Sequence, residues 1–318
     1  MKEPNKLLKE LQSALWEEAE ALLWIVHSKL RNREARYEVA RVKTNPELQK
    51  RLAQIVANEI KRARHLEPYQ YVTGDLDESD ALFLDDKEEV DFREKILPQI
   101  DDRTAADEVR SIEELFGASA YIIDLAAEGG KRVFAFKKIP EKWDSTAKNR
   151  LFSAIWQNVE LQEAEEQEVF RLSRSVDSFH YSGWSFILDK KNFEAGLNFR
   201  LGMTRHAEEL VDLLGKHKTI ANPEALIKGN ENNLRVLRSL AQVMKNPRFK
   251  DPKWITRVKQ LNANHGWQLK FEGDSIFVND ENLKLIIMLL RDRRALTLIF
   301  SEMIDADVAH VVVATTAD

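Results

Sequence analysis

Two aspartates and a lysine near the middle of the chain have the spacing of a metal-dependent nuclease site. Asp177 stands twelve residues before Asp189, and Lys191 follows two residues later. Two carboxylates can hold a divalent metal ion, and a lysine can stabilise the charge that develops on a phosphate. The alternative is an ordinary strand pair with charged ends, in which Asp189 caps the next helix. Such short motifs often arise by accident, so we favour the structural interpretation and keep a nuclease as the alternative.

A second group of side chains is suited to phosphate rather than to a metal. Residues 228–260 contain 9 Lys or Arg and 2 Asp or Glu, a net charge of +7. Phosphates require positive charge and hydrogen-bond donors without base-specific geometry. The candidate DNA contacts are Arg235, Arg238, Lys245, Arg248, Lys250, Lys253, Arg257 and Lys259.

The elements that position these cations are predicted to be a helix, a basic loop and a second helix. In the first helix, Leu234, Leu237, Ala241 and Met244 recur at helical spacing, and the cations occupy the neighbouring stripe. One face would therefore pack while the other presents positive charge.

Asp251 is expected to cap the second helix, with Pro252 at its first position. Phe249 and Trp254 are candidates for stacking on the bases of a single strand. The loop is longer than a typical helix-turn-helix turn, so we predict no sequence-specific reading.

The competing interpretation of the basic segment is a solvated helix face that pairs with an acidic surface. Residues 73–114 contain 16 Asp or Glu and 5 Lys or Arg, a net charge of −11. This acidic segment could meet the basic one in the same chain or in a second copy, or it could dock a partner protein. A protein-interaction scaffold without nucleic acid therefore stays open as an alternative function.

Other kinds of chemistry lack support in the sequence. The chain has 318 residues, a net charge of −5 and no cysteine, so it has no disulfide and no thiolate metal site. It contains no phosphate-binding glycine loop, and its 7 histidines lack metal-ligand spacing. We therefore predict a protein without a catalytic residue, a metal site or a cofactor. The N-terminus is too acidic for a signal peptide and the apolar stretches are short, which predicts a cytoplasmic protein.

The pattern of strands and helices predicts an α+β fold. The N-terminal half is expected to be rich in strands, with a hairpin that turns at Gly129 and Gly130. The C-terminal half is expected to be mostly helical, with a late hairpin over 267–278 and a terminal strand over 308–314. A charged connector over 160–168 suggests an N-terminal α/β region over 1–162 and a C-terminal α+β region over 163–318, although the two can also form one continuous domain.

Three shorter expectations complete this outline. Leucines at helical spacing predict a helix over 5–22, and a helix or irregular segment is expected over 145–160. Short helices and loops are expected over 74–114.

The order of these features resembles the KwaB family of the Kiwa anti-phage defence system. The resemblance is carried by "AYIIDLAAEGGKRVFAFKKI", then "VFRLSRSVDSFHYSGWSFILDKKNFEAGLNF", then the basic helical stretch "NNLRVLRSLAQVMKNPRFKDPKWITRVKQLN", and finally "WQLKFEGDSIFVNDENLKLIIMLLRD". It is strongest over residues 166–318 and weaker over 20–140. It rests on the succession of segments rather than on a single motif.

The resemblance implies a non-catalytic DNA-binding effector that works with a membrane-embedded partner of the KwaA type. It also implies self-association as a homodimer or a larger species, and a location at the inner membrane through that partner. Binding to incoming phage DNA would then obstruct replication and transcription. The resemblance supplies no site residues, so the DNA contacts above come from charge and spacing.

Overall fold

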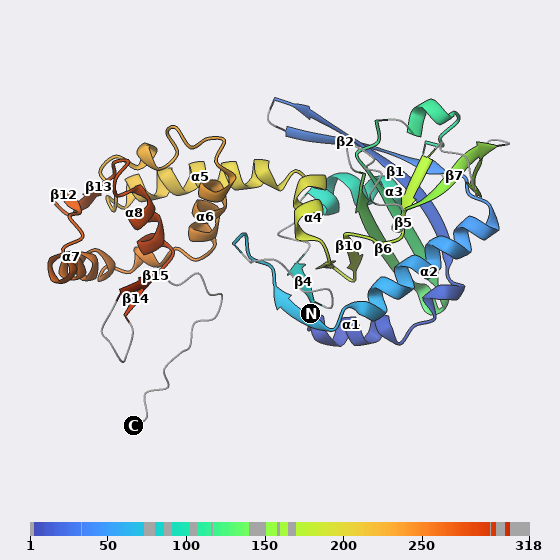
Figure 1. Cartoon of the computed structure of the whole chain (residues 1–318), viewed down its shortest axis with the longest axis horizontal. Helices are drawn as coiled ribbons and strands as arrows, with labels where there is room; N and C mark the ends of the chain where they lie inside the picture. Colours follow the sequence, from blue (N-terminus) through green and yellow to red (C-terminus); the bar gives the residue numbers. More distant parts are fainter. Residues whose placement is uncertain are drawn as a thin grey trace, which may run out of the picture. The chain divides into compact units, whose positions relative to one another are not determined.

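The chain forms an α+β fold, as predicted, and divides into two compact units (Figure 1). The first unit comprises Met1–Tyr69 and Asp75–Phe199, and the second comprises Gln70–Gly74 and Arg200–Asp318. The computed structural model describes residues 3–32, 34–72, 80–85, 91–101, 107–115, 117–139, 151–157, 160–164, 170–292, 294–296 and 303–305. The domain boundary suggested at 162/163 stays a prediction, and the compact units divide the chain at a different place.

The first unit is built on an eight-stranded sheet in the order β2-β1-β5-β6-β10-β11-β4-β3. Neighbouring strands are antiparallel except for β3 and β4, which are parallel. The strands are β1 (Glu20–Arg31), β2 (Glu34–Val42), β3 (His65–Pro68), β4 (Asp80–Asp85), β5 (Ala120–Ala127), β6 (Lys131–Lys138), β10 (Ser178–Tyr181) and β11 (Trp184–Ile187). The predicted hairpin is confirmed as β5 and β6, with Gly129 and Gly130 both at positive φ.

The described residues of this unit also form four α-helices, short 3₁₀ and π turns, and a small second sheet. The helices are α1 (Pro4–Gln12), α2 (Pro46–Arg62), α3 (Leu97–Asp101) and α4 (Lys190–Gly196). The small sheet has the order β8-β7-β9 and contains β7 (Leu151–Gln157), β8 (Glu160–Ala164) and β9 (Phe170–Ser173).

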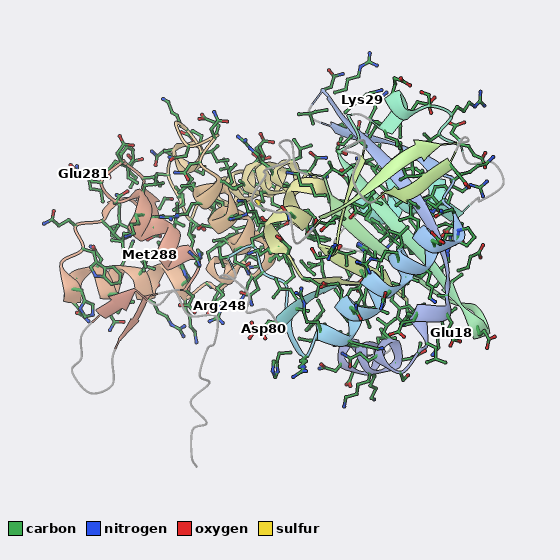
Figure 2. All side chains as sticks on the ribbon, turned by 45° about the vertical axis from the view of Figure 1, so that its right-hand side comes forward. Glu18, Lys29, Asp80, Arg248, Glu281 and Met288 are labelled. Atoms are coloured by element: carbon green, nitrogen blue, oxygen red, sulfur yellow. The ribbon has the colours of Figure 1, made fainter. Side chains whose placement is uncertain are left out.

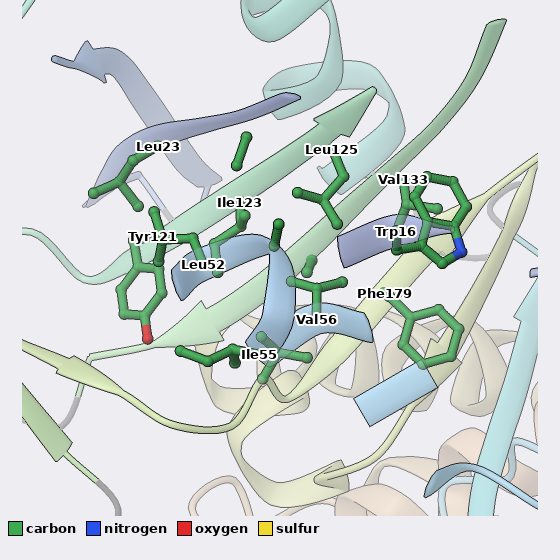
Figure 3. Packing of buried hydrophobic residues seen from close by; sticks show 14 of the residues in the cluster. Trp16, Leu23, Leu52, Ile55, Val56, Tyr121, Ile123, Leu125, Val133 and Phe179 are labelled. Atoms are coloured by element: carbon green, nitrogen blue, oxygen red, sulfur yellow. The ribbon is translucent and has the colours of Figure 1, made fainter. Parts of the chain in front are cut away.

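Helix α2 covers one face of the large sheet and supplies the centre of its core (Figure 3). The Asn45 side chain accepts a hydrogen bond of 2.9 Å from the Leu48 N–H group, and Pro46 occupies the first turn. Leu52 and Val56 then face the sheet, where they join a buried cluster with alternate residues of β5 and β6. Local capping signals and helical periodicity therefore determine where α2 begins and which face it buries.

The opposite face of the sheet is packed by aromatic side chains. Phe92 stacks on His180 with ring centroids 3.6 Å apart. Gly196 in α4 lies so close to β6 that a Cβ atom there would be 2.6 Å from the Phe136 ring. The first unit is therefore covered on both faces of its sheet.

Three elements of the first unit differ from the sequence prediction. The helix predicted over 5–22 ends at Gln12, where the Trp16 indole N–H donates to the Leu11 carbonyl and leaves Leu15 72% exposed. The strands β7 and β8 occupy 151–157 and 160–164, where a helix or irregular segment and a charged connector were expected. Residues 80–85 form β4 rather than a loop, because β11 and β3 pair with them.

The second unit is mostly helical, as predicted. Its helices are α5 (Phe199–Lys216), which begins at the last residue of the first unit, α6 (Leu234–Lys245), α7 (Trp254–His265) and α8 (Leu283–Leu290). The late hairpin is confirmed as β12 (Lys270–Glu272) and β13 (Ser275–Phe277), and β14 (Arg294–Leu296) pairs with β15 (Met303–Asp305). The terminal strand predicted over 308–314 lies outside the described residues.

Helix α8 forms the apolar centre of the second unit. Ile286 and Leu290 are fully buried, and Met288 (labelled in Figure 2) is also buried. The chain segment at Tyr71 also belongs to this unit, because the Tyr71 N–H group donates to Gln242 in α6 over 3.1 Å.

Candidate nucleic-acid interface

The predicted helix, basic loop and helix are present as α6, a 3₁₀ turn η7 (Arg248–Lys250) and α7. The Asn233 side chain caps α6 by accepting hydrogen bonds from the N–H groups of Arg235 and Val236. We use the term basic interface for the exposed cations of residues 235–259.

Two details of this unit differ from the expected pattern. Leu234 is 38% exposed, and the buried face of α6 instead contains Leu237, Leu240 and Ala241. Helix α7 begins at Trp254, two residues later than expected, because Asp251 Oδ1 accepts a hydrogen bond of 2.9 Å from the Lys253 N–H group in the preceding turn. Leu237 and Ala241 of the predicted apolar stripe are buried, and Lys253 lies in the turn before α7 rather than inside the helix.

Four of the eight candidate cations are available for a ligand. Arg235, Lys250, Lys253 and Arg257 are exposed and have no ion-pair partner within the part of the chain that the structure describes. Arg235 lies on α6, Lys250 on η7 and Arg257 on α7, and Lys253 directly precedes α7. Their charge is therefore directed to solvent, where counterions or phosphates would meet it.

The other four cations have neighbours that reduce their availability. Arg248, labelled in Figure 2, is exposed and forms an ion pair with Asp292. Lys259 lies 2.5 Å from Asp274 and is half-buried. The Lys245 ammonium lies 5.2 Å from the centre of the Tyr71 ring, and Arg238 is half-buried.

The two aromatic candidates have different environments. Phe249 is only 4% exposed and contacts His217 edge-on, so it packs in the core and cannot stack on a base. Trp254 is half-exposed in a groove that also contains Trp267. Trp267 was not among the residues singled out in the sequence, because only the packing of the chain after α7 brings it to this groove.

The structure brings Asp177 and Asp189 together, but both have structural partners. Asp177 is fully buried, and its carboxylate accepts hydrogen bonds of 2.7 Å from the Lys137 ammonium and from the Lys138 N–H group. The amide group of Asn192 donates to both carboxylates. Asp189 caps α4 through the Asn192 N–H group, as one of the two interpretations expected.

The third member of that set points elsewhere. Lys191 is exposed, and the lysine that meets Asp177 is Lys137 of β6. Burial raises the pKa of the Asp177 carboxyl, and the Lys137 ammonium opposes this shift. The described residues contain no group of three or more His, Asp or Glu side chains arranged to hold a metal ion.

An acidic groove lies on the first unit, beside β1 and β2. Its volume is about 700 Å³. Its acidic members are Glu38, Asp107, Glu108, Glu113 and Glu114. Hydrogen bonds from Arg41 and Lys43 hold the pKa of Glu108 below its usual value. The groove contains Asp107, Glu108, Glu113 and Glu114 of the acidic segment predicted over 73–114.

The helices of the described residues are too short or too polar to cross a membrane. The chain was also compared with known proteins. The sequence model of a family described as "Kiwa protein KwaB-like" matches residues 115–299, which is more than half of the chain. No curated protein and no solved structure matches it. The matched range includes the β5–β6 hairpin, Asp177 just before β10, and the whole basic interface. The chain therefore belongs to the KwaB-like family of Kiwa anti-phage defence proteins.

Proposed function

We propose that this chain is a non-catalytic DNA-binding effector, and that the basic interface binds the DNA backbone. The observation that carries the proposal is the set of four exposed cations, Arg235, Lys250, Lys253 and Arg257, without ion-pair partners among the described residues. Cations that are already neutralised by a carboxylate gain less from a phosphate than cations that face only water. The family makes phage DNA the expected target.

The arrangement favours binding without sequence specificity. Residues 246–253 separate α6 from α7, and this connection contains a 3₁₀ turn. It is longer than the 3–4-residue turn of a helix-turn-helix motif, and cations on such a connection can bind phosphates without reading base edges. A protein that coats DNA in this way would obstruct replication and transcription of any phage genome.

The test is a titration of a fluorescent DNA duplex at several salt concentrations. The triple variant Lys250→Ala, Lys253→Ala, Arg257→Ala should bind duplexes of unrelated sequence more weakly by similar factors. The slope of log affinity against log salt should become shallower by roughly 2.7, or about 0.9 for each lost phosphate contact. The matched control removes three exposed cations of the same unit outside the interface, Lys216, Lys270 and Lys284. An equal loss in both variants would contradict the proposed location.

The same titration with magnesium separates the effector from the alternative functions. Intact DNA after prolonged incubation supports a binding protein. Cleavage that requires magnesium and disappears in both Asp177→Ala and Asp189→Ala, while the circular dichroism of both variants matches the parent, would establish a nuclease instead. A chain that binds no DNA at low salt would be a protein-interaction scaffold.

We further propose that the acidic groove docks the membrane-embedded KwaA-type partner, which would place this chain at the cytoplasmic side of the inner membrane. The exposed carboxylates of Glu113 and Glu114 suit a basic cytoplasmic surface, whereas Glu38 and Glu108 already pair with basic side chains of this unit. We also expect self-association as a homodimer or a larger species. Light scattering at micromolar concentration should give at least twice the 36.8 kDa of one chain, and a monomer mass would contradict this expectation.

A further inference from the structure

A groove beside the basic interface has the composition of a site for a flat aromatic ligand. It has a volume of about 380 Å³ and lies between η7, α7, Trp267 and α8. This volume falls within the range of small-molecule sites, about 300–1,000 Å³. Every residue that lines it belongs to the second unit.

The aromatic surface of the groove comes from two tryptophans. Trp254 stands at the start of α7, and Val258 and Leu261 follow on the same helix face. Val258 is buried, but Trp254 and Leu261 stay partly exposed. Trp267 lies beyond the end of α7, also partly exposed, and stacks on His265 with centroids 5.7 Å apart. Apolar side chains of this size are normally covered, so the groove offers stacking surface to a ligand.

The charges around the groove favour a base over a phosphate inside it. Asp251 and Asp292 line the groove together with Arg248 and Arg257, and Arg248 pairs with Asp292, so the lining has no excess positive charge to draw a phosphate inside. A nucleobase is neutral, and its amino groups can donate to a carboxylate. Arg257 is exposed at the same groove, and the exposed Lys253 precedes Trp254 directly, so both can hold the adjoining phosphates.

We propose that this groove binds an unpaired base of a DNA strand by stacking on Trp254 and Trp267, while the neighbouring cations bind the backbone. The inference rests on the proposed function, since the strand is brought to the groove by the basic interface. Both faces of a base inside a duplex are covered by its neighbours, so the groove binds a base only in single-stranded or opened DNA. Stacking does not depend on base identity, which is consistent with binding to many phage sequences.

The experiment compares two single strands with the same number of phosphates. One is an oligothymidine of about 12 nucleotides, and the other is an abasic strand of equal length. Fluorescence anisotropy should show that the unaltered chain binds the base-containing strand at least about fivefold more tightly, the lower limit for one stacked base. Trp254→Ala and Trp267→Ala should reduce this preference, while their affinity for the abasic strand stays unchanged.

Two further variants serve as controls. The first shows that a lost preference is not caused by misfolding, and the second separates the stacking site from the DNA interface. Trp254→Phe retains an aromatic face and should retain most of the preference, and its circular dichroism should match the parent. The Lys250, Lys253, Arg257 triple alanine variant should bind both strands more weakly and keep their affinity ratio. Equal binding of the two strands by the unaltered chain would overturn the stacking site but leave the DNA interface standing. Absence of binding to duplex and to both strands would overturn both proposals.

Discussion

The Lys137 ammonium group lies 2.7 Å from Oδ1 of Asp177, in a pair whose side chains are 12% and 0% exposed. The pair joins β6 to the segment that leads into β10, two parts of the chain that are 40 residues apart. Asp177 also accepts a hydrogen bond from the backbone of β6 through Lys138. The Asp177 carboxylate therefore has a structural role, because it links the start of β10 to β6.

We predict that the three residues of the nuclease-like motif differ strongly in their contribution to stability. Asp177→Ala leaves Lys137 buried without its partner and should cost about 3–5 kcal/mol in the free energy of unfolding. Asp189→Ala removes a helix cap and should cost about 1 kcal/mol, and Lys191→Ala should stay within about 0.5 kcal/mol. Urea unfolding measures all three. Equal, small effects on stability combined with equal losses of DNA cleavage would contradict the structural roles.

The carboxyl of Glu59 in α2 should make the free energy of unfolding depend on pH. Burial raises the pKa of this carboxyl above its usual value, and the Arg62 guanidinium partly opposes the shift. A carboxyl whose pKa is higher in the folded than in the unfolded state favours folding at a pH below its unfolded-state pKa. This contribution to the free energy of unfolding is lost as the pH rises through the folded-state pKa. Glu59→Gln should therefore gain stability relative to the parent as pH increases from about 4 to 7. Parallel stability curves for the two proteins would show that the carboxyl is not perturbed.

Two glycines should respond to alanine in opposite directions. At Gly196 the new Cβ atom would stand 2.6 Å from the ring of Phe136, which is fully buried. The overpacking should cost about 1–3 kcal/mol. At Gly202, inside α5, the Cβ atom meets nothing within 4 Å, so Gly202→Ala should stabilise by up to about 1 kcal/mol. Thermal unfolding of the two variants provides the comparison, and destabilisation by both would mean that α5 is not a regular helix at Gly202.

Two lysines of equal charge should differ in their effect on DNA binding. Lys253 is exposed, whereas Lys259 is held by Asp274 and by the Gly273 carbonyl. Lys253→Ala should lower duplex affinity and make the salt slope shallower by about 0.9, while Lys259→Ala should change the slope much less. Salt titrations of both variants decide this point. A larger slope change for Lys259 would place the DNA along the β12–β13 hairpin instead.

The acidic groove gives a prediction for partner capture. Glu113→Lys and Glu114→Lys together reverse two exposed charges near β1 (Figure 2 shows Lys29, which lines the same groove). Capture of the membrane-embedded partner from detergent extracts should weaken, because charge complementarity contributes mainly to association. Duplex affinity should stay within about twofold, because Glu113 and Glu114 belong to the first unit and the basic interface belongs to the second. Equal losses of partner and DNA would remove the docking assignment.

The sequence by itself determined the features whose causes are local. The cap of α2 at Asn45, the turn at Gly129–Gly130 and the amphipathic pattern of α6 each depend on residues within a few positions. Such signals also identified the α+β class and the basic segment. They did not predict that α1 ends at Gln12, because the turn that follows is held by Trp16, whose side chain is buried in the core of the first unit and donates to the Leu11 carbonyl.

Only the tertiary structure decided which charges and rings are available to a ligand. In the sequence, Arg248 and Lys259 are as good candidates for DNA contacts as Lys253, yet each forms an ion pair with an aspartate from another part of the chain. Phe249 and Trp254 look alike as aromatic candidates, but one is buried and the other lines a groove with Trp267. Asp177 likewise has its partner on β6 rather than in its own motif. The physical reason is that exposure and ion pairing depend on long-range packing, which places residues far apart in the chain within a few ångströms.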